Sequence, residues 1–168
     1  MSFWVEFDDG TKRVIRFPMV GAIAQELVDE KLKIEIATMM FVSTETTIPI
    51  PKLIGYGLTG NTHHLNGLPF LILTHVPGKP LGGVWDELDE VAKVKIYDQM
   101  ADITIQLRSH PFDRIGSLTV DDRGQWSLSN RPLGRPLASL QRDGIDIRMA
   151  QSYSASLDYF IDYFCHYR

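Results

Sequence analysis

The stretch LPFLILTHVPGKPL, residues 68–81, decides the fold. Residues 70–73 form a short apolar run between chain-breaking residues, which is typical of a strand buried on both faces in the middle of a sheet. Pro77-Gly78 ends such a strand, because proline has no N–H to donate and glycine accepts a positive φ. Residues 74–76 should therefore leave the sheet with unpaired backbone groups beside an apolar wall. Such an edge suits a flat heterocycle, although a strand that simply ends in a turn has the same pattern.

The composition is that of an ordinary globular protein, since 44% of the 168 residues are hydrophobic and 23% are charged. A net charge of −4 gives no reason to expect nucleic acid as a partner. The single cysteine, Cys165, excludes an internal disulfide and a cysteine-built zinc site. The first residues lack a secretory pattern, and no apolar run reaches about 20 residues. We therefore expect no membrane partner and a cytoplasmic location.

The segments before this strand predict an antiparallel sheet that carries one helix. Residues 3–17 alternate between apolar and polar side chains and turn at Asp9-Gly10, which predicts a hairpin. Residues 22–42 predict a helix, because their apolar side chains recur at three- and four-residue steps. We expect about four or five strands in this sheet, with residues 70–73 in its centre.

The segments after this strand predict mostly helices. An apolar stripe from Leu88 to Leu107 predicts a long helix capped by Asp86 or Asp89. Residues 115–128 predict a second hairpin, and the aromatic C-terminal tail again has helical spacing. The order of elements predicts an α+β protein in two layers or lobes.

Two charged residues stand out by their placement. Arg16 ends an apolar strand, and Glu35 lies 19 positions later on the polar side of the following helix. Kinase-like phosphotransferases need this arrangement, because a cation on a strand holds the nucleotide phosphates and a helix glutamate holds the cation. Two solvated surface charges would give the same pattern, so the pair by itself leaves both interpretations open. An ion pair between Arg16 and Glu35 is expected if the first is correct.

Five segments in order resemble the fungal-type aminoglycoside phosphotransferase family, whose members share the protein-kinase-like fold. The segments are VIRFP, EKLKIEIATMMFV, TTIPIPKLIGYG, LPFLILTHVPGKPL and MADITIQLRSHPFDRIGSL. The resemblance extends to about Leu133. It implies that residues 1–76 form the N-lobe, an antiparallel sheet plus one helix. It also implies that residues 77–168 form the hinge exit and the first helices of an incomplete C-lobe.

The resemblance further implies a nucleotide site. Arg16 is similar to the family's strand cation, and Glu35 is similar to its helix partner. Leu73 would back the adenine, while Thr74 would offer its carbonyl and Val76 its N–H to the edge of the base. ATP is thus the expected cofactor, with binding that is weak or vestigial.

The chain differs from the family at the segments that carry out phosphoryl transfer. Family members have a strand and a phosphate-covering loop before the first hairpin, and we expect this chain to lack both. They also have an H-x-D-x-x-x-x-N segment and a later aspartate, which orient the acceptor and hold magnesium. None of the 168 residues matches that segment, and the nearest string, residues 110–113, is interpreted as a helix stop. No catalytic residue or metal ligand is therefore assigned, and magnesium is expected only in a full-length form.

Other polar or reactive residues carry weaker signals. His63-His64 is interpreted as a polar loop tip, because adjacent side chains in an extended chain point to opposite sides and cannot share a metal. Asp121-Asp122 is interpreted as a turn. Cys165 lies among aromatic residues and is expected to be a small buried hydrophobe.

Two functions remain open at this level. The first is ATP-dependent phosphoryl transfer to the hydroxyl or amine of a small molecule, with this chain inactive alone and its acceptor unknown. The second is a non-catalytic kinase-like module that binds a nucleotide or a protein. The apolar stripe from Leu88 to Leu107 and the aromatic tail also predict self-association through uncovered apolar surface.

Overall fold

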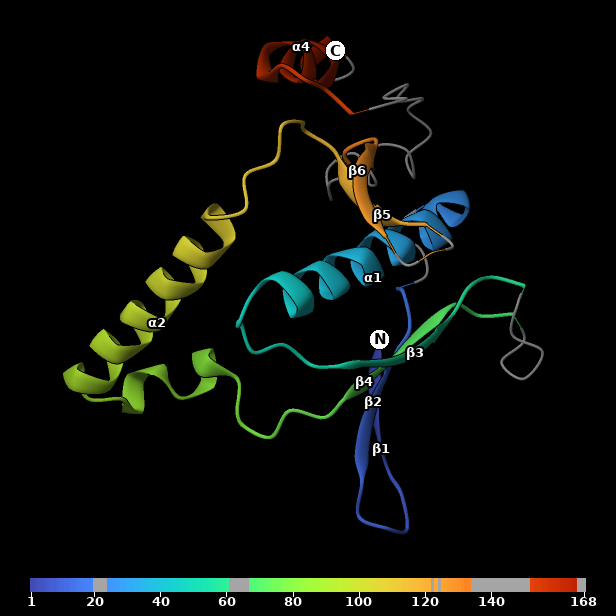
Figure 1. Ribbon diagram of the computed structural model, residues 1–168. Coiled ribbons are helices and arrows are strands. Elements are labelled where there is room, and N and C mark those ends of the chain that lie inside the picture. The colour runs from blue at the N-terminus through green and yellow to red at the C-terminus, as the bar shows by residue number, and fades with distance from the viewer. Residues whose placement is uncertain (20–23, 61–66, 122, 124, 134–151, 166–168) are drawn as a thin grey trace.

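The first part of the chain forms an antiparallel sheet in which β4 lies between β2 and β3 (Figure 1). The computed structural model describes residues 1–19, 24–60, 67–121, 123, 125–133 and 152–165. The four strands of this sheet run in the order β1-β2-β4-β3. Their bounds are Ser2–Glu6 for β1, Lys12–Arg16 for β2, Leu53–Gly57 for β3 and Phe70–Thr74 for β4. The predicted antiparallel sheet is therefore present, with β4 in its interior.

The first hairpin turns where the sequence predicts it. Gly10 has a φ of 78°, and the Asp9 carboxylate accepts a hydrogen bond from the Thr11 N–H at 2.8 Å. Glycine adopts this left-handed conformation at no steric cost, so the Asp-Gly pair selects the turn. Trp4 then lies opposite Val14 in a regular register.

Strand β4 differs from the prediction in one respect. Leu71 and Leu73 are buried, but Phe70 and Ile72 on the opposite face are only half-buried. Alternate side chains of a strand point to opposite faces of the sheet. Helix α1 (Val28–Glu45) covers only the face that carries Leu71 and Leu73. The prediction of a strand buried on both faces is therefore wrong.

Helix α1, Val28–Glu45, has apolar side chains on two of its sides, and it packs on both of them. It follows a short 3₁₀ turn, η1 (Gln25–Leu27), and so starts later than the predicted residue 22, which lies outside the described residues. Leu32 and Ile36 pack on the sheet, whereas Ala37 and Phe41 pack on a second hairpin. A helix covered on one side only would show a narrower apolar stripe.

The second hairpin lies on the side of α1 that faces away from the sheet (Figure 1). It consists of β5 (Ser117–Val120) and β6 (Trp126–Asn130). Leu118 joins Ala37 and Phe41 in a buried cluster, and the Phe41 ring also contacts the rings of His110, Phe112 and Trp126 at 4.9 to 5.6 Å between centroids. The fold therefore layers sheet, helix and hairpin.

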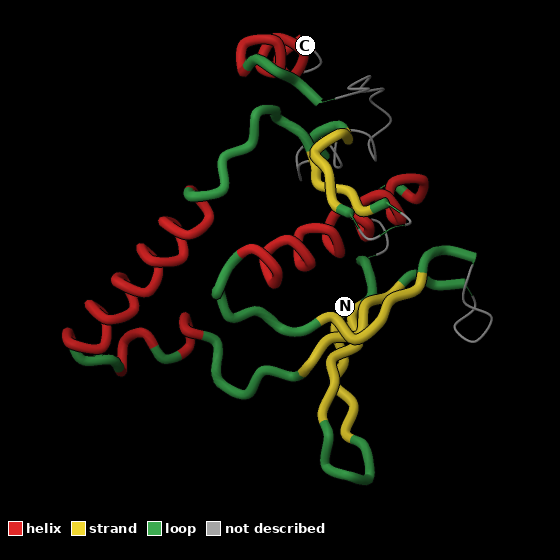
Figure 2. The backbone as a smooth tube through the Cα atoms, in the orientation of Figure 1, coloured by secondary structure: helices red, strands yellow, loops and turns green. Residues whose placement is uncertain are grey.

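Helix α2, Glu90–Arg108, extends away from this layered part (Figure 2). Two 3₁₀ turns, η2 (Leu81–Gly83) and η3 (Trp85–Glu87), connect it to β4. Asp89 caps it, since its carboxylate accepts the Ala92 N–H at 2.7 Å. Gln106 ties it to the chain after α1 by accepting hydrogen bonds from the N–H and hydroxyl of Thr47 at 2.9 and 3.0 Å.

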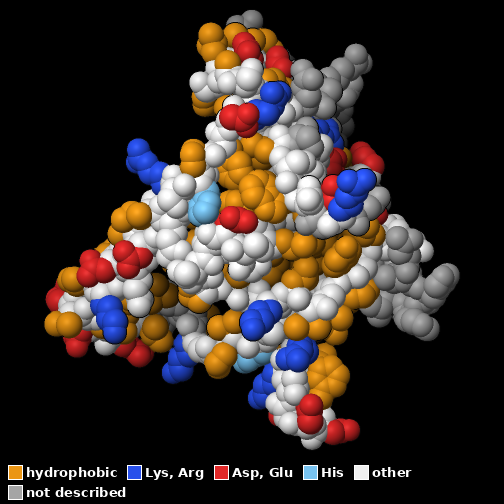
Figure 3. Space-filling model, viewed as in Figure 1, with side chains coloured by type: hydrophobic (Ala, Val, Ile, Leu, Met, Phe, Trp, Pro, Cys, Tyr) orange, Lys and Arg blue, Asp and Glu red, His pale blue; other side chains and the backbone are white. Residues whose placement is uncertain are grey.

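The predicted apolar stripe of α2 is largely uncovered (Figure 3). Val91 is 79% exposed and Met100 is 55% exposed.

None of the helices among the described residues combines the length and the apolar composition of a membrane-spanning helix.

The C-terminal segment pairs with the residues before β5 and then forms helix α4, Ser156–Cys165. Tyr153 exchanges two backbone hydrogen bonds with Ile115, and its hydroxyl donates to Asp162 at 2.8 Å. Burial, together with this hydrogen bond, raises the pKa of Tyr153 to about 12. Cys165 is exposed, so the expectation that it is buried is wrong. The apolar face of α4 around it also has a large exposed area.

Substituting Gly116 tests the close approach between β5, β6 and the C-terminal segment. A Cβ atom at this position would lie 2.6 Å from the Asn130 carbonyl oxygen and 3.0 Å from the Ser152 Cβ. We expect Gly116→Ala to lower the free energy of unfolding by about 1–3 kcal/mol, measured by urea denaturation. Gly82→Ala is the matched control, because a Cβ at Gly82 meets no heavy atom within 4 Å. Equal stability of the two variants would contradict this packing.

Candidate functional site

The pairing of β2 with β4 brings the predicted cation and the predicted adenine wall to one face of the sheet. Val14 lies opposite Leu73, and Arg16 lies opposite Leu71. Directly opposed residues of antiparallel strands share a face, as do residues two apart on one strand. Val14, Arg16 and Leu73 therefore all point to the side that α1 covers. Sequence reasoning did not single out Val14, which lies between the other two on this face.

Arg16 and Glu35 form the expected ion pair. The Arg16 Nη1 lies 2.7 Å from the Glu35 Oε1, and the two side chains are 51% and 30% exposed. A pair this open to water adds only about 0–1 kcal/mol to stability. No hydrogen bond from Nε or Nη2 of Arg16 is found among the described residues, and a guanidinium has five N–H donors, so donors remain that could bind an anion.

The predicted hinge residues lie at the end of β4. Leu73 is buried in the core between the sheet and α1. Thr74 closes the strand, since its N–H donates to the Lys52 carbonyl at 3.0 Å and its hydroxyl accepts the Lys52 N–H at 2.9 Å. Val76 is 61% exposed, and its N–H makes no hydrogen bond in the part of the chain that the structure describes. Gly78 then turns the chain with a φ of 144°, a conformation that side chains disfavour.

The spacing along the sheet suits an adenosine with phosphates attached. Thr74 lies opposite Arg13, three residues before Arg16 on β2. Three residues of a strand span about 10 Å, which is comparable with an adenine joined to a ribose. A base at the hinge would thus place its phosphates near the Arg16 guanidinium.

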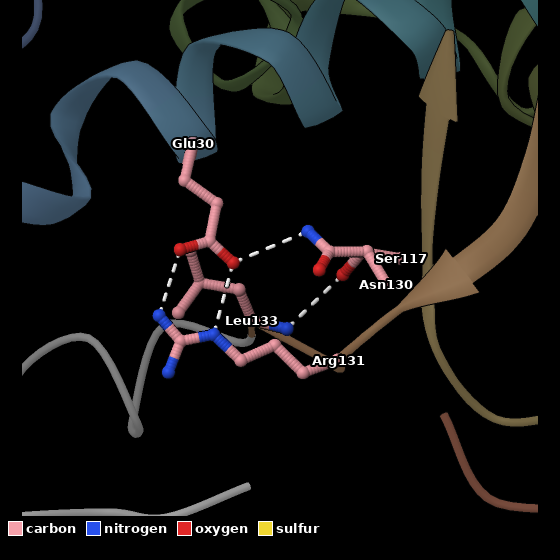
Figure 4. Close-up of polar contacts among 5 residues, drawn as sticks. All are labelled: Glu30, Ser117, Asn130, Arg131 and Leu133. Carbon is pink, nitrogen blue, oxygen red and sulfur yellow. Dashed lines mark hydrogen bonds and ion pairs between the residues drawn. The ribbon is translucent and has the colours of Figure 1, made fainter. Parts of the chain in front are cut away.

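A second charged pair holds the opposite side of α1 (Figure 4). Arg131, just after β6, donates from Nε and Nη2 to the two carboxylate oxygens of Glu30 at 2.9 and 2.7 Å. Asn130 donates to the same carboxylate at 3.2 Å. Both charged side chains are mostly buried, with 24% of Glu30 and 19% of Arg131 exposed. We call this bidentate pair the Glu30–Arg131 clamp.

The clamp changes the acidity of both partners. The hydrogen bond from Arg131 holds the pKa of Glu30 below its ordinary value, although burial by itself raises it. The hydrogen bond to Glu30 raises the pKa of Arg131. Sequence reasoning missed this pair, because its partners are 101 positions apart and neither belongs to a recognisable motif.

The remaining candidate residues either belong to a turn or lie outside the described residues. Asp121 is a turn residue, as predicted, and accepts the N–H groups of Arg123 and Gln125 at 2.9 and 2.8 Å. His63, His64 and Asp122 lie outside the described residues. Among the residues that are described, no three His, Cys, Asp or Glu side chains gather as a metal site.

Protonating Glu30 should weaken the clamp. Because the folded-state pKa of Glu30 is lowered, its contribution is present above the ordinary value of 4.5 and is lost as the pH falls through the folded value. We expect Glu30→Gln to cost about 1 kcal/mol of unfolding free energy at about pH 7, and we expect this cost to decrease as the pH falls below 4.5. Urea denaturation across this range measures the difference.

Glu26→Gln is the matched control, since Glu26 is exposed on η1 and has no partner among the described side chains. A cost for Glu30→Gln that does not change with pH would contradict the assignment.

Comparison with known proteins identifies the family. The model of the phosphotransferase enzyme family matches residues 2–157. The protein named altered inheritance of mitochondria protein 9, mitochondrial, from Debaryomyces hansenii is 30% identical over 127 residues, which are 70% of this chain and 19% of that protein. The protein of the same name from Candida tropicalis is 28% identical over 127 residues, 72% of this chain and 20% of that protein. No solved structure matches the chain.

These relatives correct the expected location and limit what can be said about function. Their names describe mitochondrial proteins, which overturns the expectation of a cytoplasmic location. The chain spans about one fifth of the length of these relatives, so nothing that their full length does passes directly to it. The family match, by contrast, covers the sheet, α1, α2 and the second hairpin. The chain therefore belongs to the phosphotransferase enzyme family.

Proposed function

We propose that this chain binds ATP on the face shared by β2, β4 and α1, in the lineage of phosphoryl transfer to a small molecule. The observation that carries the proposal is the Arg16–Glu35 ion pair, on the same sheet face as Leu73 at the start of the hinge. In kinase-like enzymes this pair holds the nucleotide phosphates. The proposed acceptor is a hydroxyl or amine of a small molecule.

Each residue of the proposed site has one role. Arg16 binds the phosphates through the guanidinium donors that Glu35 leaves free, and Glu35 holds the guanidinium in place. Leu73 backs the adenine. The Thr74 carbonyl and the Val76 N–H bind the edge of the base, and the Val76 N–H makes no hydrogen bond to the described residues.

Phosphoryl transfer needs more than this site. The reaction depends on a group that orients the acceptor and on magnesium held near the phosphates. The H-x-D-x-x-x-x-N segment that supplies these groups in the family has no counterpart in the 168 residues. The proposal for residues 1–168 is therefore nucleotide binding, without magnesium-dependent transfer.

A non-catalytic binding module is the second candidate. The observation that favours it is the exposed apolar surface of α2 and α4, which a protein partner or a second copy of the chain would cover. Turnover by a longer product of the same gene would exclude this candidate.

A mitochondrial location is proposed from the names of the relatives. Cell fractionation that recovers the endogenous protein only from the cytosol would contradict it.

Nucleotide binding should depend on Arg16 and on the phosphates. We expect residues 1–168 to bind ATP with a Kd between the high-micromolar and millimolar range, about −4 to −6 kcal/mol. Arg16→Ala should weaken ATP binding by about tenfold, or about 1.4 kcal/mol, and leave adenosine binding unchanged. Isothermal titration calorimetry with ATP and with adenosine measures both effects.

Arg13→Ala is the control for this titration, because Arg13 lies on the same strand but points to the opposite face. Equal effects of the two substitutions would show that only the general charge of β2 attracts ATP.

The polypeptide of residues 1–168 should not transfer phosphate. We expect ATP hydrolysis and transfer to remain at background with magnesium present, with and without sugars, amines or alcohols as acceptors. The reason is that positioning and charge neutralisation supply most of this catalysis, and the segment that supplies them is not in these residues. A coupled ADP-release assay measures the rate. Turnover above background that disappears in Arg16→Ala would contradict this expectation.

A further inference from the structure

The second hairpin contacts α1 on the side opposite the phosphate site. We propose that the Glu30–Arg131 clamp is a positioning device for that site: it sets the rotation of α1 and so places the Glu35 carboxylate against Arg16. This inference rests on the proposed function, since it concerns the affinity of the same site for phosphates. Arg131, just after β6, would then control the position of Glu35 through its contact with Glu30.

The two glutamates lie on different sides of one helix. Five residues of an α-helix correspond to a rotation of about 140°, so Glu30 and Glu35 point in nearly opposite directions. Glu35 reaches Arg16 at the sheet, and Glu30 reaches Arg131 at the hairpin. Because the helix is rigid, a rotation of α1 that follows from a change at one of these side chains also moves the other.

The contacts differ in strength, and this decides which pair positions the helix. Arg16–Glu35 has one short contact, and about half of the arginine side chain is exposed to water. Glu30–Arg131 has two charge-assisted hydrogen bonds in a mostly buried setting, with a third from Asn130. Bidentate pairs of this kind fix geometry as well as adding energy. Of the two charged pairs, the clamp is therefore the one that constrains the rotation of α1, in addition to the apolar contacts of the helix, and Glu35 follows.

The hairpin side of the clamp is itself held in place. Ser117, which is buried at the start of β5, accepts the Leu133 N–H through its hydroxyl at 3.0 Å (Figure 4). This bond joins the chain after Arg131 to the start of β5, and Asn130, directly before Arg131, pairs with the same Ser117 in the hairpin. The Phe41 cluster holds the opposite end of α1 to the same hairpin. Arg131 therefore acts from a fixed support.

A small rotation of α1 is enough to disturb the phosphate site. Side-chain tips lie about 5–6 Å from a helix axis, so a rotation of about 20° moves them by about 2 Å. The Arg16–Glu35 contact of 2.7 Å does not tolerate such a shift. Without Glu35, the guanidinium would lose its orientation toward the phosphates.

The test is a cycle of substitutions read with two ligands. ATP and adenosine are titrated into residues 1–168 of wild type, Arg131→Met, Arg131→Lys, Arg16→Ala and the double variant Arg16→Ala/Arg131→Met. We expect Arg131→Met to weaken ATP binding three- to tenfold and to leave adenosine binding unchanged. Arg131→Lys, which keeps the charge and one hydrogen bond, should restore part of the loss. In the Arg16→Ala background, Arg131→Met should have no further effect on ATP, because the clamp acts through Arg16.

The outcomes separate this inference from the function on which it rests. If wild type binds ATP no better than adenosine, the proposed phosphate site and the inference both fail. If wild type prefers ATP and Arg131→Met keeps the whole preference, only the inference fails. A loss of equal size for ATP and adenosine, or a loss that persists without Arg16, would make the clamp merely structural. If Arg131→Met does not fold, Glu30→Gln removes the same charged pair with little change of shape and is read in its place.

Discussion

The burial of α1 on two sides is the constraint on which the rest of the structure depends. The sheet covers Leu32 and Ile36, and the second hairpin covers Ala37 and Phe41. Neither partner alone would bury the whole apolar surface of this helix. Burial on both sides removes more apolar area from water than either contact alone, and this area is the main source of stability. It also ties residues before and after the hinge into one folded unit.

This arrangement separates the parts of α1 that stabilise it from the part proposed to bind. Its apolar side chains and the Glu30–Arg131 clamp hold the helix, while Glu35 extends to a guanidinium that is half open to water. A weak, solvated ion pair adds little to stability. It is suited to a binding site, because a ligand that binds Arg16 has to compete only with a weak contact to Glu35. Stability and binding thus depend on different residues of one helix.

The helices outside this layered part have a different character. α2 has a good N-terminal cap and a hydrogen bond to Thr47, yet its apolar side chains are mostly exposed. α4 likewise has exposed apolar side chains, and among them are the aromatic rings of Phe160 and Phe164. Apolar patches of this kind usually mark surfaces that another polypeptide covers. The family match extends over the layered part and over α2, but only in the layered part do the sheet and α1 bury each other's apolar side chains.

Local chemistry in the sequence determined several features on its own. Asp9-Gly10 specifies a turn, Asp86 or Asp89 predicts a helix cap that the structure places at Asp89, and the family resemblance predicts the ion pair between Arg16 and Glu35. Such features follow from a few neighbouring residues, or from a family pattern that preserves their spacing. Only the tertiary structure decided which face of β4 is buried, that Cys165 is exposed, and that Glu30 meets Arg131. These features depend on which surfaces are covered and on contacts across 101 positions, and no local pattern of side chains specifies either.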